Sequence, residues 1–470
     1  MERRIAPRLD RYRAALVVLA LALAPLTTLR LYGSDEIQYF AYLRSAVFDH
    51  DLDFTNEYRW FVDRDPQEYE GFATTFLGPK TPAGRYPNNG PIGSALLWSP
   101  LYLATVGIEQ ALGAGSTPPG YSRADFAAVC IASMILGVLG LLVTNEACRR
   151  FSSPASAFWA TALVWLATNL PFYMYVTPPM SHAASFFAAA LLLLAWLRCS
   201  ETPRAGFMIG LLGGLVASVR WQDALLLAAP LSTPFWPGRR AQVSWRPAAA
   251  WSLAIFAGFL LAFLPQLCVW RLLNGSVTPF GVISLSGRFR FTAPYLPGVL
   301  FSPFHGLLLW TPVLIPAFLG LAVLAVTDDR GKAMALAVVL EIYMISGYAV
   351  AFGQSFGQRL FISSLPFTAV GLVVFGERMA PRLPRALLIA GGLAAVWWNT
   401  SLMVQYATGM IPRNEGVSLG RLLENQFVGV PRRLPDVVGR YLFDRRSLYH
   451  VDPARPRGGE APADDRERGP

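Results

Sequence analysis

Charged residues are scarce in this sequence, and their scarcity excludes an ordinary soluble protein. Only 15% of the 470 residues are charged, whereas 54% are hydrophobic and the mean hydropathy is +0.39. A soluble chain of this length keeps more charge on its surface. Repeated apolar runs of about twenty residues are instead typical of transmembrane helices. The sequence therefore predicts an all-α polytopic membrane protein.

Cysteines and the common catalytic signatures are also scarce. There are four cysteines, which lie within or at the ends of apolar runs without metal-ligand spacing: Cys130, Cys148, Cys199 and Cys268. We interpret them as small packing residues that form no disulfides. The sequence has no Walker-type glycine-rich loop, no zinc spacing and no Ser-His-Asp elbow. These absences disfavour a nucleotide-driven pump and leave no cofactor indicated with certainty.

The basic residues predict how the chain is oriented. Residues 1–13 contain five arginines and precede the apolar run 14–31, a pattern that holds an N-terminus in the cytoplasm. A cleaved signal peptide is the alternative, but no small-x-small cleavage site follows. We therefore expect an uncleaved first span, with the chain emerging on the outer face. The net charge of +10 is then explained by the Lys and Arg residues that orient the chain in a bilayer. No nucleic-acid partner is expected.

Eleven spans are expected, within a range of 10–13. They follow the apolar runs 14–31, 125–146, 154–175, 183–197, 206–219, 224–236, 247–272, 305–327, 333–352, 360–376 and 386–404. The run 224–236 is short and contains Pro230 and Pro234, so its hairpin with 206–219 is irregular. Gly206, Gly210, Gly213 and Gly214 permit close helix contact there.

The apolar segment 91–112 is the ambiguous element of this topology. It contains Pro100 and ends at Glu109-Gln110. If it crossed the membrane, the arginine-rich loops after it would move to the outer face, against the positive-inside tendency. We interpret it as an interfacial or re-entrant helix within a long first outer loop, residues 32–124.

This topology divides the chain into five regions. They are a cytoplasmic basic N-terminus (1–13), a catalytic transmembrane module (14–236), C-terminal transmembrane helices (237–404), an outer tail (405–450) and a disordered, charged and proline-rich end (451–470). The unusual polar residues fall on the outer face of the membrane, so we expect any active site, and the C-terminus, to be periplasmic or extracellular.

The motif Ser34-Asp35-Glu36-Ile37-Gln38-Tyr39 places two carboxylates directly after the first span. It resembles the acidic motif in the first outer loop of GT-C glycosyltransferases, such as the protein O-mannosyltransferases and the bacterial aminoarabinose–lipid A transferases. The resemblance covers residues 13–236, and beyond them only the topology. It implies a GT-C-like fold with interfacial helices, and a polyprenyl-phosphate-sugar donor. The chain departs from the pattern in the loop 176–185, which offers Ser181 and His182 where those relatives place an acidic residue.

Roles for the candidate site residues follow from what sugar transfer from a lipid phosphate requires. Asp35 is the expected general base for the acceptor hydroxyl, with Glu36 beside it to orient the acceptor or a divalent metal ion. The alternative for both is an exposed acid pair in a loop. Arg220 and Arg359 stand alone at the outer ends of spans and suit phosphate oxygens. Either arginine would otherwise extend its side chain to the lipid headgroups.

Further substrate contacts are expected from residues near these arginines and in the motif: His182, Gln222 and Tyr39. Weaker candidates are Arg288, Arg290 and His305. The alternating Asp49, Asp51 and Asp53 lack the glycine and distal glutamate of a calcium loop, so a solvated turn is the preferred interpretation.

The sequence thus predicts an inner-membrane glycosyltransferase of GT-C type, a hexosyl- or pentosyltransferase acting with inversion. The acceptor would be a glycan, a lipid or a protein. A transporter or lipid flippase is the alternative, favoured by charges in a membrane chain and a proline-broken hairpin. Against it, the charged candidates cluster at one face and no matching halves are visible. A non-catalytic assembly protein is a third interpretation.

Overall fold

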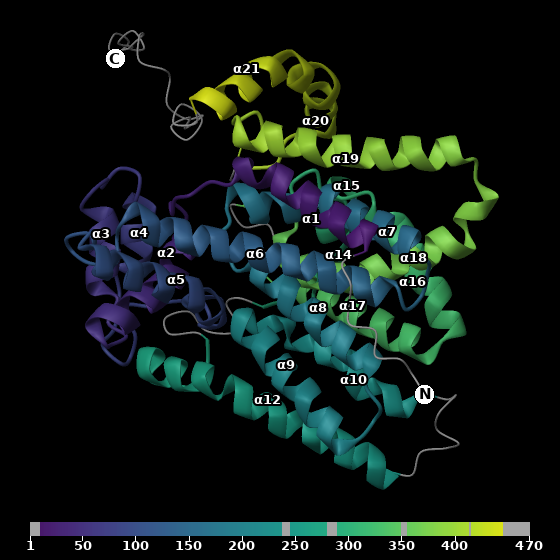
Figure 1. Cartoon of the computed structure of the whole chain (residues 1–470), viewed down its shortest axis with the longest axis horizontal. Coiled ribbons are helices and arrows are strands. Elements are labelled where there is room, and N and C mark those ends of the chain that lie inside the picture. Colours follow the sequence, from purple (N-terminus) through teal and green to yellow (C-terminus); the bar gives the residue numbers. More distant parts are fainter. Residues whose placement is uncertain (1–9, 237–244, 280–288, 349–354, 413–414, 445–470) are drawn as a thin grey trace, which may run out of the picture.

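Most of the chain is helical (Figure 1). The computed structural model describes residues 10–236, 245–279, 289–348, 355–412 and 415–444. An isolated bridge between Phe289 and Tyr348 is the only β-pairing within these ranges. The all-α fold that the sequence predicts is therefore confirmed.

The helices divide into a small outer group and a larger bundle. The outer group follows the first apolar run: α2 (Ser34–Arg44), α3 (Thr55–Val62), α4 (Glu70–Phe76) and α5 (Gly93–Leu112). The bundle contains α1 (Arg11–Leu23), α6 (Arg123–Cys148), α7 (Pro154–Leu166), α8 (His182–Arg198), α9 (Pro203–Val219), α10 (Ala228–Ser232), α12 (Trp245–Asn274), α14 (Leu296–Phe301), α15 (Leu307–Trp310), α16 (Leu314–Thr327), α17 (Asp329–Gly347) and α18 (Leu365–Arg378). It is completed by α19 (Arg385–Ala407), α20 (Leu419–Glu424) and α21 (Val430–Phe443).

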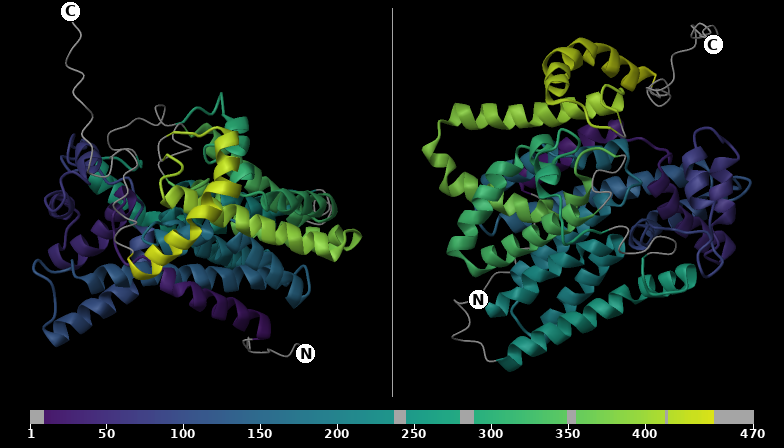
Figure 2. Two further views of the ribbon diagram at one scale, coloured as in Figure 1. Left: turned by 90° about the horizontal axis from the view of Figure 1, so that it is seen from above. Right: turned by 180° about the vertical axis from the view of Figure 1, so that it is seen from behind.

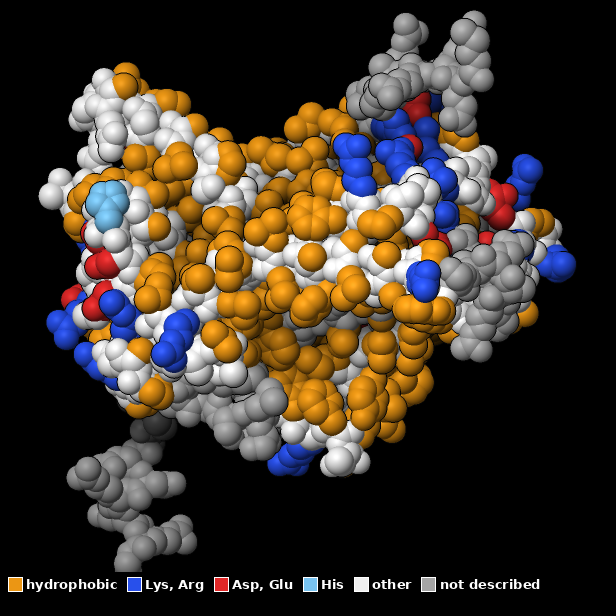
Figure 3. Space-filling view, turned by 90° about the horizontal axis from the view of Figure 1, so that it is seen from below, with side chains coloured by type: hydrophobic (Ala, Val, Ile, Leu, Met, Phe, Trp, Pro, Cys, Tyr) orange, Lys and Arg blue, Asp and Glu red, His pale blue; other side chains and the backbone are white. Residues whose placement is uncertain are grey.

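The surface of the bundle is that of a membrane protein. Within the described residues, four segments are long and apolar enough to cross a bilayer: α6, α12, the segment Arg359–Arg382 that contains α18, and α19. Four shorter apolar helices accompany them: α7, α8, α9 and α16. Figure 3 shows a broad belt of apolar side chains with charged side chains gathered at both of its ends. A bilayer requires such a surface, whereas the direction in which the bundle faces remains a prediction from the arginines.

Helices α12 and α19 border the bundle on opposite sides (Figures 1 and 2). Only 28% of the apolar window of α12 and 17% of that of α19 is buried inside the protein, against 78% for the segment that contains α18. Because apolar side chains on α12 and α19 have no protein to cover them, lipid is their natural environment. Residues Arg359–Arg382 occupy the interior.

Four expected spans are interrupted or shortened. In the run 14–31, α1 ends at Leu23 and only a 3₁₀ turn, Ala24–Leu26, follows. The run 154–175 is helical only as far as Leu166 and then passes into a short π-helical turn at Phe172–Val176. The run 224–236 consists of the 3₁₀ segment η4 (Trp221–Leu227), α10 and a final 3₁₀ turn. In the run 305–327, α16 begins only at Leu314. Prolines in or beside each break explain it, because proline removes a backbone donor and clashes with the preceding turn.

Glycines bring α9 and α12 into close backbone contact. A Cβ atom on Gly210 would lie 2.0 Å from the carbonyl oxygen of Ile255, and one on Gly258 would lie 2.1 Å from that of Phe207. Neither position accepts a side chain without separating the helices. The close helix contact that the glycine-rich sequence of α9 predicts is confirmed.

The outer group has a core of its own, built from aromatic rings. Its fully buried members include Phe40, Tyr42, Phe54, Tyr58, Trp98 and Tyr102. Beside them Arg44 donates from Nη1 to Oε1 of the buried Glu57 at 2.9 Å, and it also pairs with Asp49. Burial raises the pKa of Glu57 to about 7, with Arg44 opposing the rise. The first outer loop is therefore a packed unit rather than a loose connection.

The C-terminal helices dock on the end of α19. Gln405 donates from Nε2 to Oε1 of Gln426 at 2.8 Å, and Gln426 donates to the carbonyl oxygen of Trp398 at 3.1 Å. The predicted disordered end, 451–470, lies outside the described residues.

Candidate functional site

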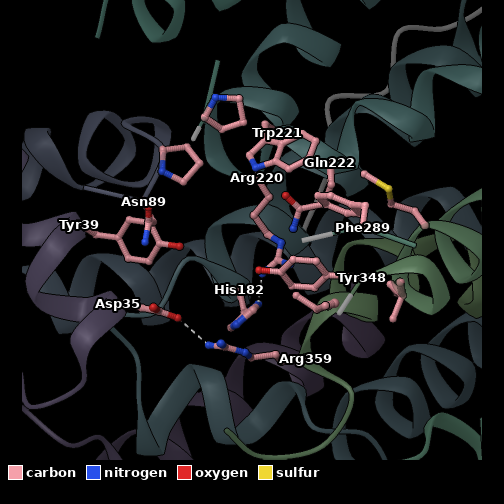
Figure 4. A pocket seen from close by; sticks show the side chains of 16 residues that line it. Asp35, Tyr39, Asn89, His182, Arg220, Trp221, Gln222, Phe289, Tyr348 and Arg359 are labelled. Carbon is pink, nitrogen blue, oxygen red and sulfur yellow. Dashed lines mark hydrogen bonds and ion pairs between the residues drawn. The ribbon is translucent and has the colours of Figure 1, made fainter. Parts of the chain in front are cut away.

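A cavity of about 210 Å³ lies where the outer group meets the bundle. Side chains from the start of α2, the start of α8, η4, α17 and the 3₁₀ segment η6 (Arg359–Ser364) line it (Figure 4). Among them are six of the seven predicted site residues: Asp35, Tyr39, His182, Arg220, Gln222 and Arg359. The structure therefore brings together residues that the sequence scatters over more than 300 positions.

Asp35 and Arg359 form an ion pair within this cavity. Nη1 of Arg359 donates to Oδ2 of Asp35 at 2.7 Å, and the two side chains are 39% (Asp35) and 23% (Arg359) exposed. Asp35 lies in the first turn of α2, where the helix dipole favours a negative charge. Both partners can still be reached from the cavity, so an entering ligand can displace either one from the other.

Glu36, the neighbouring carboxylate, does not line the cavity. It is 1% exposed, and its Oε2 accepts hydrogen bonds from the backbone N–H groups of Tyr32 (2.8 Å) and Gly33 (2.9 Å). Burial raises the pKa of Glu36 to about 7, while these N–H groups and Arg30 act in the opposite direction. The side chain of Glu36 therefore fixes the backbone that leads into α2. In this way it helps to position Asp35, but it does not face the cavity as Asp35 does.

His182 and Arg220 form a second polar pair at the cavity wall. Nη1 of Arg220 lies 2.8 Å from Nδ1 of His182. A guanidinium can only donate, so Nδ1 must be the acceptor and the imidazole proton must reside on Nε2. In Figure 4 His182 lies between Arg220 and Arg359. The cavity therefore contains two guanidinium groups and an imidazole N–H donor in one region.

Tyr39 and the segment 88–91 form the wall on the side of the outer group. The hydroxyl of Tyr39 hydrogen bonds to Oγ of Ser181 at 3.1 Å, and burial raises its pKa. Gln38 binds the segment that contains Asn88 and Asn89. Its backbone carbonyl oxygen accepts a hydrogen bond from Nδ2 of Asn88, and its Oε1 accepts one from the N–H of Asn89. The motif thus stabilises the backbone around the cavity through the carboxamide of Gln38 and the carboxylate of Glu36.

Aromatic rings form the remaining wall. Trp221 meets Phe289 edge to face at 5.9 Å, and Phe289 packs against Tyr348 at 5.0 Å. Met344 and Ile345 of α17 add apolar surface. One cavity therefore offers cations and a carboxylate on one side and rings with aliphatic groups on the other.

The sequence did not single out Asn89, Phe289 or Tyr348 as site residues. Phe289 lies between Arg288 and Arg290 in the sequence, and nothing in the sequence signals that it faces Trp221. The three weaker candidates, Arg288, Arg290 and His305, are not part of the cavity lining in the described part of the chain. Arg290 is exposed outside the cavity lining, Arg288 lies outside the described residues, and Nδ1 of His305 accepts from the N–H of Gly357 at 3.1 Å.

The aspartates of the outer loop bind their own chain. Asp51 accepts from Oγ of Ser45 at 2.8 Å and from the N–H of Asp53, and Asp53 accepts from Thr55. Across the described residues, no group of three or more His, Cys, Asp or Glu side chains could hold a metal ion. Asp35 instead has a guanidinium as its cationic neighbour.

The chain was compared with family models, with curated proteins and with solved structures. No family model matches the chain, and no curated protein matches its sequence. Among solved structures, the chain is similar to ArnT from Cupriavidus metallidurans bound to undecaprenyl phosphate, with a TM-score of 0.48 and 14% identity over 93% of this chain and 77% of that one. At this TM-score and identity, no residue role is carried over to this chain.

Proposed function

We propose that this protein is a membrane glycosyltransferase that transfers a sugar from a polyprenyl-phosphate-linked donor to an acceptor hydroxyl. One observation carries the proposal: Asp35, Arg220 and Arg359 converge with an aromatic wall in a single cavity beside the membrane bundle. A lipid-linked sugar phosphate needs these same features, namely cations for the phosphate, rings for sugar or lipid, and a carboxylate near the bond that breaks.

Arg359 and Arg220 are assigned to the donor phosphate. Guanidinium groups match phosphate oxygens in charge and geometry. When phosphate binds, Arg359 turns its donors to the phosphate oxygens and releases the carboxylate of Asp35. The 2.7 Å pair between Asp35 and Arg359 is then the resting arrangement, which holds the base and the cation within reach of one substrate.

The chemical step is a single displacement at the anomeric carbon. Asp35 accepts the proton of the acceptor hydroxyl as its oxygen forms a bond to that carbon. The bond from the carbon to the phosphate oxygen breaks, and the polyprenyl phosphate leaves with the electron pair. Arg359, Arg220 and the Nε2–H of His182 stabilise the charge that grows on the leaving group. Attack opposite the leaving group inverts the configuration of the sugar.

The aromatic side of the cavity is assigned to the apolar part of the donor. Trp221 and Phe289 present ring surface next to Met344, and such surface suits a sugar face or the first isoprene units. Gln222, Asn89 and Tyr39 supply polar groups for sugar hydroxyls. The acceptor reaches Asp35 from the side of the outer group.

The proposal is tested with purified protein and a panel of labelled polyprenyl-phosphate sugars. Wild type should yield a product whose mass equals acceptor plus one sugar, with release of polyprenyl phosphate. Asp35→Asn should abolish transfer and retain donor binding, since the amide cannot take the proton. Asp63→Asn removes an exposed carboxylate of the same loop outside the cavity, and it should transfer sugar like wild type.

Two results would contradict the proposal. One is a folded Asp35→Asn variant that transfers sugar at the wild-type rate. The other is movement of an unmodified lipid across vesicles by wild-type protein with no product of altered mass, which would assign the cavity to a transporter or flippase.

A further inference from the structure

Two buried carboxyl groups stand behind the cavity wall without any role in the reaction described above. Asp223 of η4 and Glu341 of α17 are both 0% exposed. Neither carboxyl oxygen of Glu341 has a hydrogen-bond partner in the described part of the chain, and those of Asp223 have only Ser363 and Arg220 nearby, outside good hydrogen-bond geometry. Carboxyl groups in such surroundings require an explanation, because burial of an uncompensated charge is costly.

The cation that accounts for them is Arg220. Its Nε lies 3.5 Å from Oδ2 of Asp223, and Glu341 interacts electrostatically with both residues. Arg220 is itself only 6% exposed. Its Nη1 donates to His182, while Nε and Nη2 have no hydrogen bond among the described residues. Helix α17, which carries Glu341, packs against η4. The three side chains therefore form one buried charge cluster, which borders the cavity at Arg220 beside His182.

The charge of the cluster follows from its composition. If both carboxyl groups were ionised, the three side chains would carry a net charge of −1 in a site where both carboxyl groups are fully buried and Arg220 is only 6% exposed. With one proton retained, the net charge is zero. The neutral state is favoured because a buried net charge has no solvation to offset it.

We infer that Asp223 and Glu341 together carry a single negative charge that holds Arg220 in place against His182. They are positioning residues, since neither lines the cavity. By holding Arg220 at Nδ1 of His182, they keep the imidazole proton on Nε2, where it can donate to an anion in the cavity. The role in donor binding rests on the proposed function, whereas the charge balance does not.

The test uses the neutral isosteres Glu341→Gln and Asp223→Asn, separately and together. In either single variant the remaining carboxyl group can ionise and keep Arg220 compensated. In the double variant no countercharge remains. We expect the double variant to lower the melting temperature of the purified protein in detergent by more than the sum of the two single shifts.

A triple variant keeps this test independent of a simple folding defect. Addition of Arg220→Gln to the double variant removes the uncompensated cation, so the melting temperature should rise above that of the double variant. Additive single shifts, or a triple variant no more stable than the double, would overturn the inference.

The kinetic readout separates positioning from general stability. Relative to either single variant, the double variant should raise the donor KM by about tenfold or more, a difference of roughly 1.4 kcal/mol in binding, with a smaller change in kcat. Equal losses in all three variants would contradict the positioning role. If wild type transfers no sugar from any polyprenyl-phosphate donor, the proposed function fails, while the melting temperatures still decide the charge balance.

Discussion

Replacement of Glu36 by glutamine tests whether the second carboxylate of the motif is a fastening group or a chemical one. Its pKa of about 7 in the folded protein compares with an ordinary value of 4.5. One pKa unit corresponds to about 1.4 kcal/mol, so this difference is worth roughly 3 kcal/mol of unfolding free energy. The folded state binds the proton more tightly than the unfolded state does. The stabilisation is therefore complete below pH 4.5 and is lost as the pH rises through 7.

The Glu36→Gln variant should lack this pH dependence. The amide oxygen can accept the same N–H groups of Tyr32 and Gly33, and it cannot ionise. At pH 5 the variant and wild type should unfold at similar temperatures. At pH 8 the variant should be more stable, because wild type then carries a buried carboxylate. Sugar transfer should persist, in contrast to its loss in Asp35→Asn.

Melting temperatures of the purified proteins in detergent between pH 5 and pH 8 provide the measurement. Glu68→Gln is the control, since Glu68 is an exposed carboxylate of the same outer group and its replacement should give a curve parallel to that of wild type. Parallel curves for Glu36→Gln and wild type would refute the reasoning. Loss of sugar transfer in a stable Glu36→Gln protein would instead show that Glu36 takes part in the reaction.

Three further variants test the packing and the cavity. Gly210→Leu should lower the free energy of unfolding by about 3 kcal/mol or more, and the melting temperature with it, because a side chain there meets the backbone of Ile255. A small effect would show that α9 and α12 separate freely. Arg44→Gln should destabilise the protein by roughly 3 kcal/mol at pH 8 and by less at pH 5, because the Glu57 left unpaired can be protonated at the lower pH. Equal destabilisation at the two pH values would contradict the pairing of Arg44 with Glu57. Trp221→Ala should raise the donor KM by about tenfold with a smaller change in kcat, and an unchanged KM in steady-state assays would remove this ring from the donor site.

Much of the fold follows from the sequence because apolar run length and glycine spacing are local properties. Most long helices of the bundle coincide with the predicted runs except where proline interrupts them, whereas α14, α20 and α21 lie outside those runs. Proline breaks are harder to place, since a proline can sit in the first turn of a helix, kink it or end it. The structure distinguishes these outcomes at Leu166 and at Leu314, where neighbouring packing decides.

The site was predictable only in part, for reasons of geometry. Asp35 and Arg359 could be found because the predicted topology places both on the same face of the membrane. The inward turn of Glu36 follows from helix geometry, since successive residues project about 100° apart, but it requires knowing that α2 begins at Ser34. The pairing of Phe289 with Trp221 depends on the path of a long loop, and no local pattern reports it.

The ion pair between Asp35 and Arg359 joins residues 324 positions apart, which has a consequence for biogenesis. At about 5–20 residues per second, a ribosome needs on the order of tens of seconds to pass from one partner to the other. Throughout that interval the nascent chain has Asp35 without its cation. Under the proposed function, catalytic competence would be acquired only after Arg359 has been synthesised, and chains truncated before Arg359 should transfer no sugar.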